Sequence, residues 1–301
     1  MILKTKARKR KLVQDLAVMA CRKPQIGGIW RRLLRNKLGM VGIIIVVVLV
    51  VLCLFANVFA RYPYDLQFFE HRFEYPSLRF WFGTDNFGRD LWSRLLYGGR
   101  VSLLVAFTAT LISGGLGAVF GAIAGYFGGK VDIAIMRFMD ILMAVPPILM
   151  AISVSVALGS GPLNTALAIS ITGIPHGTRI MRSTVMAIKS NDFIEAARAT
   201  GSSSARIIFK HVVPNTISPL LVNSTLMIGG NIMVISGLSF VGLGVRPPTP
   251  EWGSILVAGR QYIREFWPIV LFPSLLITLT LFGFNLFGDA LRDALDPRLK
   301  D

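Results

Sequence analysis

The sequence is poor in charged side chains and in the residues that build most catalytic or metal sites. Only 16% of its 301 residues are charged, against about 25% in an ordinary soluble domain. Its three histidines, at positions 71, 176 and 211, are too dispersed to predict a metal cluster. The two cysteines, Cys21 and Cys53, predict no disulfide framework. Hydrophobic residues reach 53% instead, so the composition indicates a membrane protein.

Patterns for nucleotide binding and covalent catalysis are also missing. Gly129 and Lys130 resemble the end of a phosphate-binding loop, G-x-x-x-x-G-K-[ST], but Ala124 and Val131 occupy two required positions. Ser239 lacks the second glycine of a nucleophile elbow, so we expect it to pack. We therefore expect neither an ATP site nor a catalytic nucleophile on this chain.

The chain contains six apolar runs with no charged residue in their interiors. A helix of about 20 residues crosses the ~30 Å hydrocarbon core of a bilayer. The runs are 40–60, 101–128, 141–158, 165–180, 219–243 and 269–288. They predict an all-α membrane protein with six transmembrane helices. Ion-coupled carriers usually need charged residues inside their spans, so a secondary carrier or channel is the disfavoured alternative.

The net charge of +16 is unevenly distributed. Residues 1–39 hold twelve Lys or Arg and one acid, and 179–211 hold six basic residues and two acids. Because basic residues gather on the cytoplasmic side of membrane proteins, both segments and both termini are predicted to be cytoplasmic. The basic residues flank spans rather than forming one face, so they do not predict binding to nucleic acid.

The flanking regions divide the rest of the chain. In the basic tail 1–39, the stretch 29–38 predicts an amphipathic helix on the anionic inner leaflet, with Trp30, Leu33, Leu34 and Leu38 on one side. The run 40–60 is longer than the roughly 7 to 15 residues of a signal-peptide core, which favours a retained first span. An extracytoplasmic loop is expected over 61–99, and a cytoplasmic tail over 290–301.

The most polar segment between spans is 192–214, for which we predict two short helices. Asp192 and Glu195 have capping-box spacing, so Asp192 is expected to accept from the backbone N–H of Glu195. Gly201 can end this helix in the left-handed conformation, after which Ser202 or Ser203 starts a second helix. Pro214 is expected to end that one.

A helix that carries Ala196 and Ala197 is thin on one face and can enter a groove on a partner protein. Since the chain has no energy source of its own, we expect this segment to receive movement from an external motor. A merely solvated basic loop is the alternative.

Within the spans, two sets of residues suggest packing and a pathway. Gly117, Gly121 and Gly125 repeat every four residues, which favours close helix packing over the lining of a conduit. Prolines bend membrane helices where protein or a watery cavity satisfies the freed carbonyls. The candidates for lining a pathway are therefore Pro146, Pro147, Pro175 and the small polar Ser153, although such serines also join helices.

Two external stretches combine charges and aromatic residues. The candidates for contact with an extracytoplasmic partner are Asp85, Arg89 and Asp90 in one stretch, and Glu251 and Trp252 in the other. An ordered loop that only covers the membrane face is the alternative in both cases.

These residues resemble a known family. Glu195-Ala196-Ala197-Arg198, Gly201 and Pro214 resemble the EAA loop, the coupling helix of ABC-importer permeases. His211 and Val213 replace Ile and Leu of the general pattern, as in the peptide and nickel branch. The stretches 82–90, 247–253 and 289–299 are similar to those of the C-type permease of that branch.

The resemblance implies a type I ABC-importer permease, with a conserved domain over about 100–289 and a coupling loop over 182–218. It implies a heterodimer with a homologous permease, two cytoplasmic ATPases that carry ATP and Mg²⁺, and a peptide-binding protein outside the membrane. This chain then needs no cofactor and performs no catalysis. Nickel or another small ligand is the alternative cargo. A scaffold that binds an ATPase without transport, and an intramembrane enzyme, are the remaining rivals.

Overall fold

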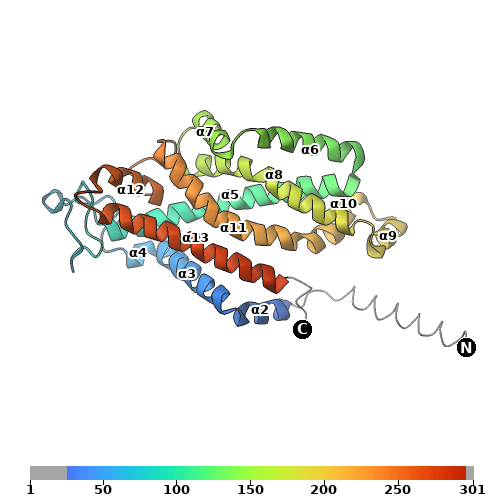
Figure 1. Ribbon diagram of the computed structural model, residues 1–301, viewed down its shortest axis with the longest axis horizontal. Helices are drawn as coiled ribbons and strands as arrows, with labels where there is room; N and C mark the ends of the chain where they lie inside the picture. The colour runs from blue at the N-terminus through green and yellow to red at the C-terminus, as the bar shows by residue number, and fades with distance from the viewer. Residues whose placement is uncertain (1–25, 296–301) are drawn as a thin grey trace, which may run out of the picture.

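A computed structural model describes residues 26–295 as an elongated bundle of helices (Figure 1). No β-strand occurs in this range; an isolated bridge joins Thr84 to Asp90. The all-α fold class is thus confirmed. The helices are α2 (Ile26–Arg35), α3 (Lys37–Leu54), α4 (Ala56–Phe59), α5 (Leu91–Phe127), α6 (Gly129–Ala144), α7 (Pro147–Leu158), α8 (Pro162–Ile188), α9 (Asp192–Ala199), α10 (Ser204–Ile207), α11 (Val213–Phe240), α12 (Trp252–Gly259) and α13 (Pro268–Leu295). Short turns at Phe69–His71, Ile208–Val212 and Arg260–Tyr262 complete the described elements.

The six apolar runs all fall on helices, but they do not form six straight spans. Four helical segments are long and apolar enough to cross a membrane: α3, α5, the continuous stretch Ser204–Phe240, and α13. The run 141–158 is a bent pair instead, because α6 and α7 meet at an angle of 89°. Pro146 and Pro147 occupy this break, and Pro147 begins α7. The 27-residue α8 is long enough to span, yet it is more polar than those four.

Several helices extend beyond the predicted ends of the runs. α5 begins at Leu91 rather than near residue 101, because the side chain of Asp90 caps it by accepting from the N–H of Ser93. α13 continues through Leu295, so residues 290–295 are helical rather than a loose tail. Neither extension was predicted, because both contain polar residues and only apolar runs were used to place the helices.

The predicted helix over 29–38 is interrupted. Asn36 accepts from the N–H of Gly39 and caps α3, so Leu38 belongs to α3 and not to the amphipathic helix α2. Leu33 is buried on Ala290 and Ala294 of α13, whereas Leu34 is 47% exposed. The side chain of Trp30 lies outside the described residues.

The most extensive helix contact joins α5 to α8, and glycines make it possible. A Cβ atom on Gly117 would lie 2.9 Å from the carbonyl carbon of Gly177, and one on Gly121 would lie 2.5 Å from the carbonyl oxygen of Thr178. At Gly125 it would lie 2.8 Å from the Cβ of Val185. The predicted glycine stripe therefore lies where α8 approaches the backbone of α5.

The two ends of the bundle differ. The loop between α4 and α5 lies at one end of the long axis, together with α12, and α9 lies at the other end (Figure 1). We call these the loop end and the α9 end. The main buried cluster is centred on α5, α11 and α13, with Trp252 and Phe266 wholly inside it near the loop end.

Candidate functional site

The segment around α9 differs from the predicted capping box. Asn191, not Asp192, is the N-cap residue, and its side chain makes no capping hydrogen bond. Asp192 and Glu195 both lie in the first turn of α9. Their carboxylates therefore act on the positive end of the helix dipole rather than as a reciprocal cap.

The glycine bend is present as the sequence predicts. Gly201 has φ +74°, and its N–H donates to the carbonyl of Arg198 over 2.9 Å. The next N–H, of Ser202, donates to the carbonyl of Ala197 over 3.2 Å. These two bonds close a Schellman motif, which favours glycine at the left-handed position. Ser203 then caps α10 by accepting from the N–H of Arg206.

Pro214 does not end the second helix, contrary to the prediction. The chain stays helical from α10 through α11, and Pro214 lies in the first turn of α11. A π-helical turn, Ile208–Val212, precedes it, and the N–H of Val213 donates to the carbonyl of Ile208. The wider turn accommodates a proline that can donate no hydrogen bond of its own. α10 is thus continuous with the membrane helix α11, and only the bend at Gly201 separates α9 from this long helix.

One side of α9 is fixed to the bundle. Ile194 is fully buried, in a cluster with Met181, Val185 and Ile207. Arg198 lies over Tyr126 near the end of α5, and its Nε atom is 3.4 Å from the phenolic oxygen. α9 therefore has tertiary contacts with α5, α8 and α10 and is not a loosely solvated loop.

The other side of α9 faces outward. Asp192, Glu195 and Ala196 are exposed, and Ala197 is half-buried. The sequence analysis missed two exposed aromatic residues of this region, Phe193 on α9 (39% exposed) and Phe209 in the π-helical turn (61% exposed). An aromatic residue within a short polar segment was the signal available to find them, because exposed aromatic groups are typical of protein interfaces.

The predicted pathway residues differ in how exposed they are. Pro146 and Pro147 are exposed at the α6–α7 break, and Ser153 is exposed on α7, where its hydroxyl donates to the carbonyl of Leu149. Pro175 is buried within α8 beside its contact with α5. The first three residues are thus exposed in this conformation, whereas Pro175 is not.

Ion pairs hold α6 against α8. Arg182 makes two hydrogen bonds to the carboxylate of Asp132, one of 2.6 Å, and Arg179 lies 2.7 Å from Asp140. The sequence showed these charges at the ends of runs but could not pair them. They fix the bent α6–α7 unit to the helix that leads directly into α9.

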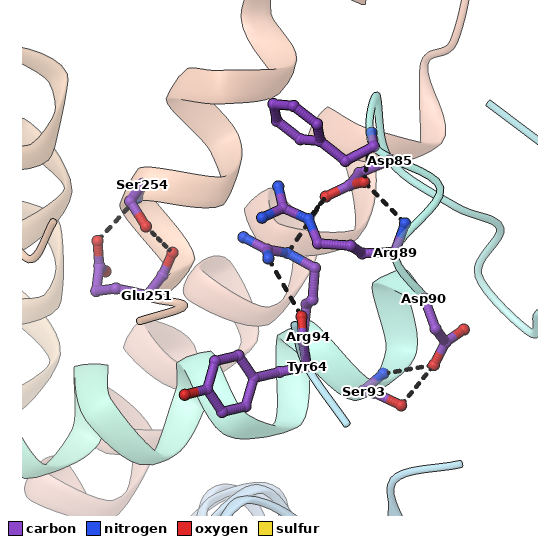
Figure 2. A network of polar contacts seen from close by, with 9 residues as sticks. Tyr64, Asp85, Arg89, Asp90, Ser93, Arg94, Glu251 and Ser254 are labelled. Carbon is purple, nitrogen blue, oxygen red and sulfur yellow. Dashed lines mark hydrogen bonds and ion pairs between the residues drawn. The ribbon is translucent and has the colours of Figure 1, made fainter. Parts of the chain in front are cut away.

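At the loop end, Asp85 is the centre of a buried network (Figure 2). Its Oδ1 accepts from the N–H groups of Phe87 and Arg89, and its Oδ2 lies 2.7 Å from Nε of Arg89 and 3.4 Å from Nε of Arg94. Arg94 also donates to the carbonyl of Tyr64. The network joins the loop to the first turn of α5.

Asp90 caps α5 beside this network (Figure 2). Its Oδ2 accepts from both the N–H and the hydroxyl of Ser93, while its Oδ1 is buried without a partner among the described residues. Burial raises the pKa of the Asp90 carboxyl above its ordinary value, although the hydrogen bonds from Ser93 act in the opposite direction.

Glu251 joins three helices. Its carboxylate is fully buried and accepts from the hydroxyls of Ser102 on α5 (2.9 Å) and Ser239 on α11 (2.7 Å). It also accepts from the N–H groups of Gly253 and Ser254 and so caps α12. Ser239 therefore makes a polar contact rather than only packing.

The predicted contact with an external partner needs correction. Asp85, Asp90, Glu251 and Trp252 are at most 2% exposed, because they bind to their own chain, and Arg89 is mostly buried beside Asp85. Trp252 donates its ring N–H to the carbonyl of Leu95. These residues shape the loop end from inside, and a docking protein cannot reach them in this conformation.

The bundle resembles a solved transporter. Its fold matches the structure described as inward facing conformations of the MetNI methionine ABC transporter, with a TM-score of 0.54 and 18% identity, over 68% of this chain and 98% of that one. At this level of identity the likeness shows that the two bundles share a fold.

Comparison with family models identifies the class of protein. Residues 117–301 match the family described as binding-protein-dependent transport system inner membrane component, and residues 25–76 match the N-terminal TM domain of oligopeptide transport permease C. The chain belongs to this family of ABC-importer permeases. It is an integral inner-membrane subunit that performs no catalysis, works with a substrate-binding protein, and leaves ATP hydrolysis to an ATPase partner.

Relatives cover nearly the whole chain. The dipeptide transport system permease protein DppC of Alkalihalophilus pseudofirmus is 42% identical over 90% of this chain and 89% of its own length. A putative peptide transport system permease protein of Brucella abortus is 41% identical, over 90% and 91%. The glutathione transport system permease protein GsiD of Escherichia coli is 42% identical, over 90% of each chain.

Proposed function

We propose that this permease forms one half of a translocation pathway for di- or oligopeptides, and that a homologous permease forms the other half. The relatives support the cargo, because they include permeases named for dipeptide, peptide and glutathione transport at 41–42% identity. Glutathione is itself a tripeptide and is the second candidate cargo. Nickel is the third, from the resemblance of the 210–215 stretch to that branch.

The proposal rests on one observation, that α9 has one side packed against the bundle and one side exposed. Ile194 and Arg198 fix it to the bundle, while Phe193, Glu195 and Ala196 remain exposed. A helix that is held on one side and exposes an aromatic ring beside a small alanine on the other fits a groove on a partner. We assign that groove to one of two cytoplasmic ATPases, which bind ATP and Mg²⁺.

The proposed orientation places both termini and α9 in the cytoplasm. The excess of basic residues in 1–39 and 179–211 supports it. The loop end then faces outward, where a substrate-binding protein delivers cargo. Exposed residues of that end, such as Leu78 (94% exposed), are better placed for contact than the buried acids.

Site-specific photo-crosslinking tests the orientation and the partners. A photoreactive residue at Phe193 is expected to capture an ATPase subunit, and one at Leu78 the binding protein. Capture of the ATPase from position 78 contradicts the assignment. Capture of neither protein from position 193 contradicts it as well.

Uptake into proteoliposomes tests the cargo. The assembled importer is expected to take up labelled dipeptide only with ATP, with glutathione and nickel tested in parallel. Uptake that persists without ATP and without ATPase subunits identifies a secondary carrier and overturns the proposal.

A further inference from the structure

We propose that the cavity between α8, α11 and α13 binds the headgroup of an anionic phospholipid. The cavity encloses about 470 Å³ near the α9 end of these three helices. Its lining consists of Ile180, Ser218, Pro219, Val222, Asn223, Leu226, Arg292 and Leu295. It lies apart from the coupling helix and from the loop-end network.

The polar part of the lining offers hydrogen-bond donors and a positive charge. Arg292 supplies a guanidinium, and none of the described lining residues is acidic. Asn223 accepts at Oδ1 from Nε2 of His176 over 3.2 Å. Its Nδ2 is buried without a partner among the described residues. Ser218 adds a hydroxyl. Arginine and amide N–H groups that have no acceptor within residues 26–295 fit a phosphate oxyanion.

The rest of the lining is apolar and selects the kind of anion. Ile180, Pro219, Val222, Leu226 and Leu295 form most of the wall. A hydrated free phosphate leaves these side chains in contact with water, whereas the glycerol and acyl groups of a lipid cover them. The cavity therefore matches an amphiphile with an anionic head.

The depth of the cavity in the membrane agrees with this ligand. Helix α2 lies against the last turns of α13, with Leu33 buried on Ala290 and Ala294, while Arg31 and Arg35 are exposed. A basic amphipathic helix lies at the headgroup level of a bilayer. Arg292, between Ala290 and Ala294 in the same stretch of α13, is thus held where lipid phosphates lie.

Two acids of α13, Asp289 and Asp293, lie near Arg292 in the sequence, and neither is among the described residues that line the cavity. Asp293 accepts from the side chain of Asn36, which precedes α3, and so lies on the side of α13 that faces α2. The proposal does not depend on the peptide cargo. Only the naming of the leaflet as the cytoplasmic one rests on the proposed orientation.

Lipid retention tests the proposal. The assembled importer is reconstituted in nanodiscs with an equimolar mixture of phosphatidylcholine and phosphatidylglycerol, extracted in mild detergent, and weighed by native mass spectrometry. We expect selective retention of phosphatidylglycerol. Arg292→Gln is expected to reduce it by roughly tenfold, as for loss of one charge-assisted hydrogen bond.

Two further variants separate binding from folding. Val222→Phe places a ring in the cavity, keeps every charge, and is expected to exclude the lipid as well. Arg264→Gln removes an exposed cation near the loop end and is expected to retain the lipid as the wild type does. Equal retention of both lipids by the wild type, or unchanged retention in Arg292→Gln, overturns the proposal. So does Arg292-dependent retention of a labelled dipeptide in place of the lipid, which makes the cavity a cargo site.

Discussion

The guanidinium of Arg198 lies over the ring of Tyr126, with its Cζ atom 5.1 Å from the ring centroid. This contact joins the helix that we assign to ATPase docking to the end of α5. Ile194 supplies the apolar part of the same attachment. The outward-facing helix α9 and the long membrane helix α5 are thus in direct contact.

Replacing Tyr126 is expected to loosen this attachment. Tyr126→Leu removes the cation–π interaction, which contributes about 0.5–1 kcal/mol at an exposed site. The number of peptides imported per ATP hydrolysed should fall a few-fold. Tyr126→Phe keeps the ring and loses only a long 3.4 Å contact, so it should behave as the wild type. An unchanged transport ratio in Tyr126→Leu contradicts the role.

At Gly201, the backbone conformation that a new residue prefers, and not the size of its side chain, is expected to decide whether the substitution is tolerated. A Cβ atom there meets nothing within 4 Å, but φ is +74°. Asn adopts this conformation readily, whereas a β-branched residue is strained by about 1–3 kcal/mol. ATP-driven uptake should therefore survive Gly201→Asn and fall in Gly201→Val, at equal membrane abundance. Equal loss in both variants indicates direct contact with the partner instead.

Two glycines on α5 are expected to differ sharply in how much their replacement by alanine destabilises the protein. In Gly121→Ala the new Cβ would lie 2.5 Å from the carbonyl oxygen of Thr178 and 2.6 Å from the Cβ of Met181. Overpacking of this kind costs about 1–3 kcal/mol. Gly115 has nothing within 4 Å, so Gly115→Ala is the matched control and should be neutral or stabilising. The thermal unfolding temperature in detergent measures the difference, and equal values contradict the packing role.

Two buried acids at the loop end are also expected to differ in how much their replacement by asparagine destabilises the protein. Asp85→Asn leaves Arg89 and Arg94 without their carboxylate and should destabilise the protein by about 3–5 kcal/mol. Asp90→Asn should cost under about 1 kcal/mol, because Asn caps helices as well as Asp does. Burial already disfavours the charged form of Asp90, since it raises the pKa of that carboxyl. Chemical unfolding that ranks the two variants in reverse contradicts this interpretation.

The sequence predicted the features that depend on local patterns. All six apolar runs are helical, and the left-handed Gly201 lies where turn chemistry requires it. The break between α6 and α7 was harder to place, because two adjacent prolines permit either a kink or a new helix axis. Only packing against α8 decides between them.

The loop-end network could not be read from the sequence for a different reason. Ser102 and Glu251 are 149 residues apart. Within the bundle, the side chain of Asn231 on α11 likewise donates to Thr110 on α5, 121 residues away. No spacing rule connects such pairs before the fold is known. An exposed, charged loop was therefore the natural expectation for Glu251, although its carboxylate lies wholly inside the protein.

The length of α5 has a mechanical consequence. Its 37 residues form a rod of about 55 Å, whereas the hydrocarbon core is only about 30 Å thick. One end carries the cap at Asp90, and the other carries Tyr126 beneath Arg198. For a lever of this length, a tilt of about ten degrees displaces the far end by about 10 Å. A small rotation imposed at α9 would therefore be magnified on the opposite face of the membrane.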